Sequence, residues 1–144
     1  MKTIVVSGAR SNVGKTRLAR ELCALLPGSV HVKIGHGKEK ADEGNVFYHV
    51  GTPFSRIARE VGRADFAVIE SNSVLEELEP DCAIYLPGGS PKPSAKRAIG
   101  KADIVRGKSV SRDTIARLAV RLGLAEETVL GIVERAGAFP EGAS

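Results

Sequence analysis

The sequence predicts an α/β fold of three layers, in which a mostly parallel sheet is followed by a C-terminal helical hairpin. Two observations lead to this prediction. Short apolar runs alternate with helical patterns up to about residue 108, and from Ser111 onwards the pattern is helical throughout. Strands that alternate with helices are typical of a doubly wound sheet with helices on both faces. The chain of 144 residues is long enough to bury one such core.

Six short apolar runs, each bounded by polar or turn-forming residues, are the expected strands: 2–7, 30–34, 46–50, 66–70, 82–86 and 102–105. Helices are expected between them at 15–26, 53–61, 74–78 and 94–99. Pro27 and Gly28 stop the first helix. Thr52 is placed to cap the second helix, Pro53 to occupy its first position and Gly62 to end it.

A phosphate-binding P-loop is predicted between the first strand and the first helix. The residues Ala9-Arg10-Ser11-Asn12-Val13-Gly14-Lys15-Thr16 fit the pattern Ala/Gly-x-x-x-x-Gly-Lys-Ser/Thr. Backbone N–H groups of this loop can surround a β-phosphate, and the helix that begins near Gly14 adds its positive dipole end. Lys15 is expected to reach the β- and γ-phosphates, while the Thr16 hydroxyl binds the Mg²⁺ that bridges them. The expected ligand is therefore GTP or ATP with Mg²⁺.

A carboxylate, Glu70, ends the expected strand 66–70 after four apolar residues, at the edge where parallel sheets bind ligands. In P-loop proteins an acid at such a strand end holds Mg²⁺ or its water shell. We therefore predict Thr16 and Glu70 as the metal ligands. Lys15 and Glu70 are the predicted catalytic residues. The alternative is that Glu70 only caps the helix that follows. Asp65 begins the same strand and is expected at the opposite edge.

The segment Lys33–Lys40 is a polar, glycine-dotted loop after the second strand. It can sense the γ-phosphate or contact a second substrate, and a merely solvated loop is equally compatible with the pattern. We expect His31 to be a structural strand residue and His36 and His49 to be surface residues. No zinc site is predicted.

The Gly- and Pro-rich segment 87–93, with the nearby Lys96 and Arg97, is expected at the base or ribose end of the nucleotide. The chain contains no Asn-Lys-x-Asp motif, so guanine and adenine both remain open. Arg10 occupies the place of a second, signature lysine found in one branch of dimeric P-loop proteins. It is either a phosphate contact across a dimer or a solvent-facing side chain.

Composition limits the classes of partner. The net charge is +4, and its excess of basic residues lies within 1–108, which suits a nucleotide binder and does not by itself indicate nucleic acid. Cys23 and Cys82 lie in apolar runs without metal or redox spacing, so both are expected in the core. No apolar run approaches about 18 residues, and no leader pattern is present, so a cytoplasmic protein is expected.

The chain resembles the molybdopterin-guanine dinucleotide biosynthesis protein B family in three places: the P-loop, the Lys33-x-x-His36 element, and the strand end Val68-Ile69-Glu70 followed by Ser71-Asn72. The resemblance covers about the first hundred residues. It implies a three-layer P-loop NTPase fold of the SIMIBI class, GTP binding, weak hydrolysis and a homodimer. It also implies an accessory role, with a partner enzyme, in adding a nucleotide to molybdopterin or in its delivery.

The helical tail forms a second part of the chain, 109–144, which we expect to pack on the P-loop nucleotide-binding domain at 1–108. Its helices break near Gly123, with a spacing similar to that of a helix-turn-helix. However, Glu126 and Glu127 open the second helix, where a DNA-reading helix presents basic or amide side chains. A hairpin packed on the sheet or on a partner is therefore preferred, and DNA binding is not expected.

Three functions follow from these observations. The first is a Mg²⁺-dependent purine nucleotide-binding protein, a slow GTPase or ATPase that assists assembly of the molybdenum cofactor. The second is a small-molecule kinase that uses the same P-loop and holds its acceptor with the loop 33–40. The third is a nucleotide-gated regulator that acts through the helical tail.

Overall fold

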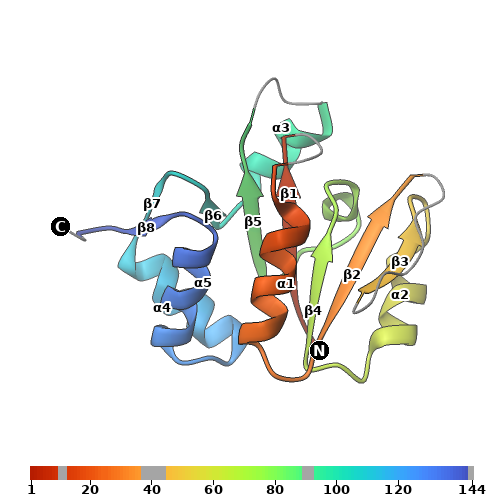
Figure 1. Cartoon of the computed structure of the whole chain (residues 1–144), viewed down its shortest axis with the longest axis horizontal. Helices are drawn as coiled ribbons and strands as arrows, with labels where there is room; N and C mark the ends of the chain where they lie inside the picture. The colour runs from red at the N-terminus through yellow and green to blue at the C-terminus, as the bar shows by residue number, and fades with distance from the viewer. Residues whose placement is uncertain (10–12, 37–44, 89–92, 143–144) are drawn as a thin grey trace.

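The computed structural model describes residues 1–9, 13–36, 45–88 and 93–142. In this part of the chain, six strands form one sheet in the order β3-β2-β4-β1-β5-β6, and every pairing is parallel (Figure 1). The strands are β1 (Lys2–Gly8), β2 (Ser29–Gly35), β3 (Asn45–His49), β4 (Phe66–Glu70), β5 (Cys82–Leu86) and β6 (Ile104–Val105). The predicted parallel sheet is confirmed.

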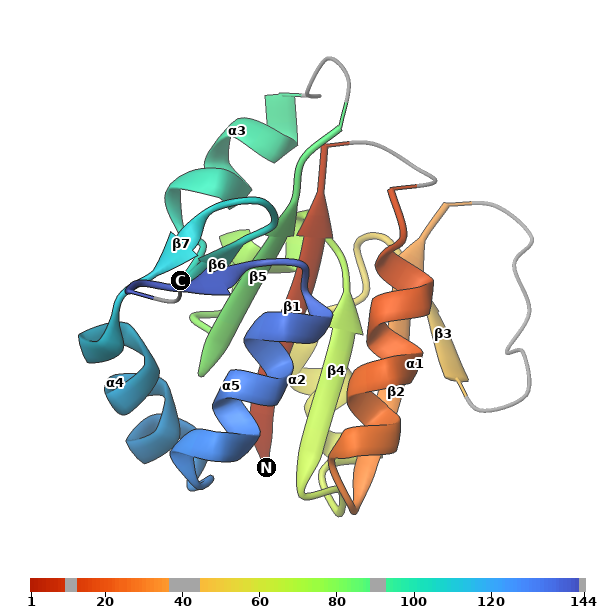
Figure 2. The ribbon, with the colours of Figure 1, turned by 60° about the vertical axis from the view of Figure 1, so that its left-hand side comes forward.

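Helices cover both faces of the sheet. They are α1 (Lys15–Leu25), α2 (Phe54–Val61), α3 (Pro93–Gly100), α4 (Arg112–Leu122) and α5 (Glu126–Arg135), with a 3₁₀ turn η1 (Ser73–Glu76) after β4. One apolar cluster joins α1, α4 and α5 to the sheet, and a second joins α2, η1 and α3 to the opposite face. Figure 2 shows α1 and α5 on the near side of the strands. These three layers confirm the predicted fold class.

Alternation along the strands decides which face each side chain joins, because successive residues point to opposite faces. Ile4 and Val6 of β1 belong to the cluster under α1, and Val5 belongs to the other cluster. In β4, Val68 also lies under α1. Glu70, two residues later, therefore lies on the same face as α1, and this places its carboxylate beside the start of that helix.

The helical tail shares the core of the sheet. Ser111 caps α4 by accepting a hydrogen bond from the Thr114 N–H, and Gly123 ends α4 in the left-handed region at φ 68°. Apolar side chains of both tail helices are buried in the cluster that contains α1, among them Leu118, Leu122, Val129, Ile132 and Val133. The two helices begin and end close to where the sequence predicts them.

Two short strands at the ends of the tail were not expected. β7 (Ser109–Val110) pairs in parallel with β8 (Phe139–Pro140). Each has two residues, which is too short for a strand pattern to be recognised in the sequence. This pairing brings the segment after α5 back to the segment after β6.

The start of α2 corrects the predicted cap. Pro53, and not Thr52, is the N-cap residue, and no side chain of that residue bonds to the helix. Instead, the Phe54 N–H donates to Glu77 Oε1 at 3.2 Å. The cap thus comes from a residue distant in sequence, and such a partner is invisible to a rule that reads neighbouring residues.

Two other elements differ in detail. The helix expected at 74–78 is the 3₁₀ turn η1, and the strand expected at 102–105 is only β6, because residues 101 and 102 close the turn after α3. Among the described helices, none has the length and apolar character needed to cross a membrane.

Candidate nucleotide site

The candidate site lies at the carboxyl ends of β1 and β4. These strands are neighbours in the sheet, and in their register Val6 of β1 is paired with Glu70 of β4. The P-loop leaves β1 two residues later and leads into α1. Pairing of the two strands therefore brings the predicted phosphate loop and the predicted metal ligand to the same place.

Gly14 makes the turn into α1. It is the N-cap residue, with φ 95° and ψ 19°, and Lys15 is the first residue of the helix. A side chain is strained at this φ, so the glycine of the motif is required by the backbone. The first N–H groups of α1 have no partner within the helix and face the position where the motif predicts phosphate. Arg10, Ser11 and Asn12 lie outside the described residues.

The loop folds closely over the end of β1. A Cβ atom on Gly8 would lie 2.6 Å from Val13 Cγ2 and 3.3 Å from Lys15 Cδ, so the Lys15 side chain passes directly over this glycine. Ala9 is buried, and its N–H donates to the Leu86 carbonyl at 3.0 Å. The methyl group of Ala9 therefore packs in the core, and its N–H is already bonded to the end of β5.

Thr16 and Glu70 meet at the centre of the site. The Thr16 hydroxyl donates to Glu70 Oε1 at 2.6 Å, although the two residues are 54 apart in sequence. Glu70 is 3% exposed. The capping alternative for Glu70 receives no support from η1, whose N-cap residue is Asn72 and makes no side-chain cap bond.

The second oxygen of Glu70 is held by His31. His31 Nε2 bonds to Glu70 Oε2, and both side chains are buried. Burial alone would raise the pKa of Glu70, but the hydrogen bonds from His31 and Thr16, with the electrostatic effects of His31 and Lys33, outweigh it and lower that pKa below its usual range. Glu70 is therefore an ionised carboxylate with both oxygens engaged.

His31 was expected as a structural strand residue, and its role as partner of Glu70 was missed. A signal was present in the strand pattern: Val32 packs on the far face, and so the residues on either side of it, His31 and Lys33, point to the α1 face. The register of the sheet determines which strand end these side chains meet, because β2 pairs with β4 and places Lys33 beside Glu70.

Asn72 clamps the start of the P-loop. Its amide accepts from the Gly8 N–H at 2.9 Å and donates to the Gly8 carbonyl at 2.8 Å. This pair of bonds satisfies the N–H and the C=O of Gly8, the last residue of β1, from a neighbouring strand end. Asn72 was part of the strand-end sequence that carried the family resemblance, but its contact with the loop was not predicted.

Arg106 holds the other side of the loop and was not predicted in any role. It follows β6, and its Nη1 donates to the Val13 carbonyl at 2.9 Å. Its Nε donates to the carbonyl of Ala136, the C-cap residue of α5, at 3.1 Å. The only available signal was its place directly after a strand, at the edge where parallel sheets bind ligands.

The donor set at this point fits Mg²⁺. A hydroxyl and a carboxylate oxygen stand together beside a helix N-terminus, and Mg²⁺ is usually held by one or two protein oxygens with phosphate and water completing its shell. In the described part of the chain, no three His, Cys, Asp or Glu side chains gather into a metal cluster. Thr16 and Glu70 therefore suit a cation that arrives with phosphates.

The remaining predicted residues lie around this centre. Lys33 is half-buried, and His36 is exposed at the end of β2. Asp65 lies at the opposite edge, as predicted, where its carbonyl accepts from the Lys2 N–H. Arg97 forms an ion pair with Glu76 of η1. Residues 37–44 and 89–92, which belong to the expected acceptor and base loops, lie outside the described part.

No model of a known protein family matches this chain, and no curated protein sequence matches it. The expected relation to the molybdopterin-guanine dinucleotide biosynthesis protein B family therefore rests on the quoted motif residues alone.

Proposed function

We propose that this protein binds a purine nucleoside triphosphate together with Mg²⁺ at the P-loop and hydrolyses the nucleotide slowly. The observation that carries the proposal is the bond between Thr16 and Glu70 at 2.6 Å, at the N-terminus of α1. A hydroxyl from the phosphate-binding helix and a carboxylate from a neighbouring strand end are the two protein groups that this chemistry requires.

Each residue of the site has a distinct task in this proposal. Lys15 and the N–H groups at the start of α1 bind the phosphates, and Thr16 with Glu70 holds Mg²⁺. When bound, Mg²⁺ supplies positive charge that neutralises the phosphate oxygens. Both oxygens of Glu70 already accept hydrogen bonds, from Thr16 and His31. Glu70 therefore serves as a positioned anion and not as a free general base, which favours slow hydrolysis.

The cellular role that we propose comes from the resemblance of the motifs. The protein would assist assembly of the molybdenum cofactor as a homodimer, with GTP as the nucleotide and a cofactor-biosynthesis enzyme as partner. Binding of GTP in preference to ATP would support this role. Equal binding of both nucleotides would favour a different pathway for the same phosphate site.

Titration calorimetry with GTP and with ATP, each with and without Mg²⁺, tests the proposal. We expect binding of at least one nucleotide, tighter in the presence of Mg²⁺, and loss of measurable binding in Lys15→Ala. Lys2→Ala is the control, because it removes an exposed lysine from the amino end of β1, at the edge of the sheet opposite the site. Binding that is equal in wild type and Lys15→Ala would contradict the proposal.

A small-molecule kinase is the second candidate, and one observation favours it. The β2–β4 register places Lys33 beside Glu70, so the loop that follows β2 begins at the edge of the site. Release of inorganic phosphate without any acceptor would support the hydrolase, whereas turnover that requires an added acceptor would support the kinase.

A further inference from the structure

Arg106 joins three segments that are far apart in the sequence. Its backbone N–H donates to the Tyr85 carbonyl of β5, while its guanidinium reaches Val13 of the P-loop and Ala136 at the end of α5. The side chain is half-buried. Both guanidinium bonds go to carbonyl oxygens, so neither neutralises its charge.

The bond to Val13 bears directly on the phosphate loop. In a trans peptide the C=O and the following N–H point in opposite directions. The guanidinium holds the Val13 carbonyl on the side of β6 and α5, so the N–H of Gly14 is turned to the opposite side, away from Arg106. A charged donor on the carbonyl also polarises the peptide and makes that N–H a stronger donor to an anion.

The bond to Ala136 extends this arrangement to the tail. Ala136 is fully buried and caps α5, and the next residues are tied to the same segment after β6: the Gly107 N–H donates to the Gly137 carbonyl at 2.9 Å. One guanidinium therefore fixes the orientation of a P-loop peptide and the end of the last helix at the same time.

We propose that Arg106 is a positioning residue of the nucleotide site, through which the C-terminal helices set the affinity of the P-loop for phosphate. The inference rests on the proposed nucleotide binding and adds the regulation of that site. Coupling of this kind is reciprocal: if docking of α5 favours nucleotide, nucleotide stabilises the docking of α5 by the same factor.

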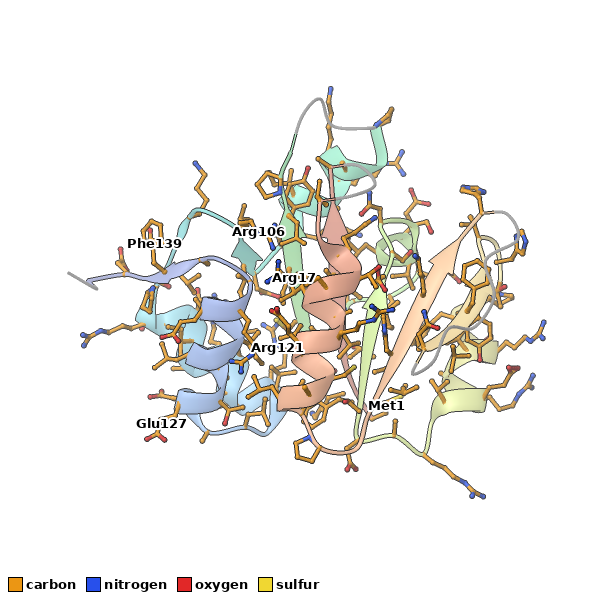
Figure 3. The ribbon with its side chains drawn as sticks, in the orientation of Figure 1. Met1, Arg17, Arg106, Arg121, Glu127 and Phe139 are labelled. Atoms are coloured by element: carbon orange, nitrogen blue, oxygen red, sulfur yellow. The ribbon has the colours of Figure 1, made fainter. Side chains whose placement is uncertain are left out.

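An arginine of the tail, Arg121, supplies a matched control. Arg121 of α4 donates to the Asp81 carbonyl at 3.1 Å and pairs with Asp103 at 3.7 Å, at the amino ends of the strands. Figure 3 labels both arginines, with Arg121 below Arg106 and away from the P-loop end of the sheet. Both tie the tail to the sheet, but only Arg106 contacts the phosphate loop.

Hydrogen exchange of the wild-type protein is the first test, since it needs no variant to fold. The N–H groups of residues 136–139 are all hydrogen-bonded, so their exchange reports opening of this segment. We expect exchange at 136–139 to slow when GTP or ATP is added with Mg²⁺, whichever nucleotide binds. If nucleotide binds and exchange there is unchanged, the coupling is absent and the inference is wrong.

Affinity of variants is the second test. Loss of one charged hydrogen bond corresponds to about a tenfold loss of affinity or more. We expect this loss in Arg106→Ala, a smaller one in Arg106→Lys, which retains the charge but has one donor group, and none in Arg121→Ala. Equal affinity of Arg106→Ala and Arg121→Ala would overturn the inference while leaving nucleotide binding intact. Absence of binding to wild type would instead refute the proposed function, and the inference with it.

Discussion

The two ends of the parallel sheet use the same kind of bond for different purposes. At the amino ends, Asp81 accepts from the Thr3 N–H at 2.8 Å and Asp103 accepts from the Ala83 N–H at 2.8 Å. At the carboxyl ends, Asn72 and Arg106 hold peptide groups of the P-loop. In both places a side chain satisfies a backbone group, but only the carboxyl ends concentrate these contacts on one loop.

The two ends of the sheet also differ in how their charged side chains are paired. At the amino ends Arg121 pairs with the carboxylate of Asp103 and donates to the backbone carbonyl of Asp81, so opposite charges meet within the protein. At the carboxyl ends the side chain of Arg106 donates to two carbonyls of the described residues, and the N-terminus of α1 adds positive potential. The amino ends thus pair charges with one another, whereas the carboxyl ends hold the ionised Glu70 beside the N-terminus of α1, which suits the proposed binding of Mg²⁺ together with phosphate.

Among the substitutions that test this difference between the two ends, we expect those of Glu70 to have the largest effect on stability and on Mg²⁺-dependent nucleotide binding. Glu70→Ala leaves buried His31 without its partner, and breaking a buried pair costs about 3–5 kcal/mol of unfolding free energy. Glu70→Gln retains the shape and an acceptor for Thr16 but removes the charge. We therefore expect Glu70→Gln to fold normally and to lose the gain in nucleotide affinity that Mg²⁺ provides, by about tenfold or more. Urea unfolding and calorimetry with and without Mg²⁺ measure the two effects separately.

Glu70→Gln with an undiminished Mg²⁺ effect would show that the carboxylate is not part of a metal site. Asn72→Ala is a suitable companion variant, because it alters the same strand end without removing a charge.

Asp103→Ala tests the opposite end of the sheet. It leaves the buried N–H of Ala83 without an acceptor, which costs about 1–3 kcal/mol of unfolding free energy. Because the change lies at the amino ends, nucleotide affinity should stay as in wild type. A denaturation curve and a binding isotherm on the same sample give both quantities. A loss of nucleotide affinity in Asp103→Ala would contradict the proposal that the two ends of the sheet have separate roles.

His31 offers a smaller and more specific test. His31→Ala removes the donor to one oxygen of Glu70, and loss of a residue that orients a metal ligand lowers metal affinity by about tenfold. His31→Gln can restore a donor in the same region. We expect the Mg²⁺ dependence of nucleotide binding to weaken in His31→Ala and to recover in part in His31→Gln, with little change in binding without Mg²⁺. Equal weakening with and without Mg²⁺ would indicate a purely structural histidine.

The sequence was sufficient for features that depend on neighbouring residues. The apolar runs located every strand of the main sheet, and the motif located the start of α1 at Gly14. The break at Gly123 was also found, since a left-handed glycine ends a helix by its own backbone freedom.

Features that depend on tertiary contacts were not accessible in this way. The cap of α2 comes from Glu77, the partner of Glu70 is set by the β2–β4 register, and Arg106 reaches Val13 over 93 residues of sequence. None of these partners is fixed by local spacing. The same limit explains the missed pairing of β7 with β8, because two-residue strands carry almost no pattern of their own.

Labelling of the two cysteines tests how tightly the amino ends of the strands are packed. Burial raises the pKa of the Cys82 thiol, and the neighbouring Asp103 carboxylate raises it further. Burial also raises the pKa of Cys23, which is only half-buried. The reactive species is the thiolate, so a raised pKa slows labelling at pH 8, and the rate for Cys23 should climb as the pH rises.

We therefore expect a thiol reagent at pH 8 to modify Cys23 slowly and Cys82 only when the protein unfolds. Mass spectrometry of the labelled peptides distinguishes the two sites. Asp103→Ala should speed labelling of Cys82, because it loosens the amino end of β5 and increases transient opening. Rapid labelling of Cys82 in the wild-type protein would show that the amino ends are not the closed, stabilising region that their hydrogen bonds indicate.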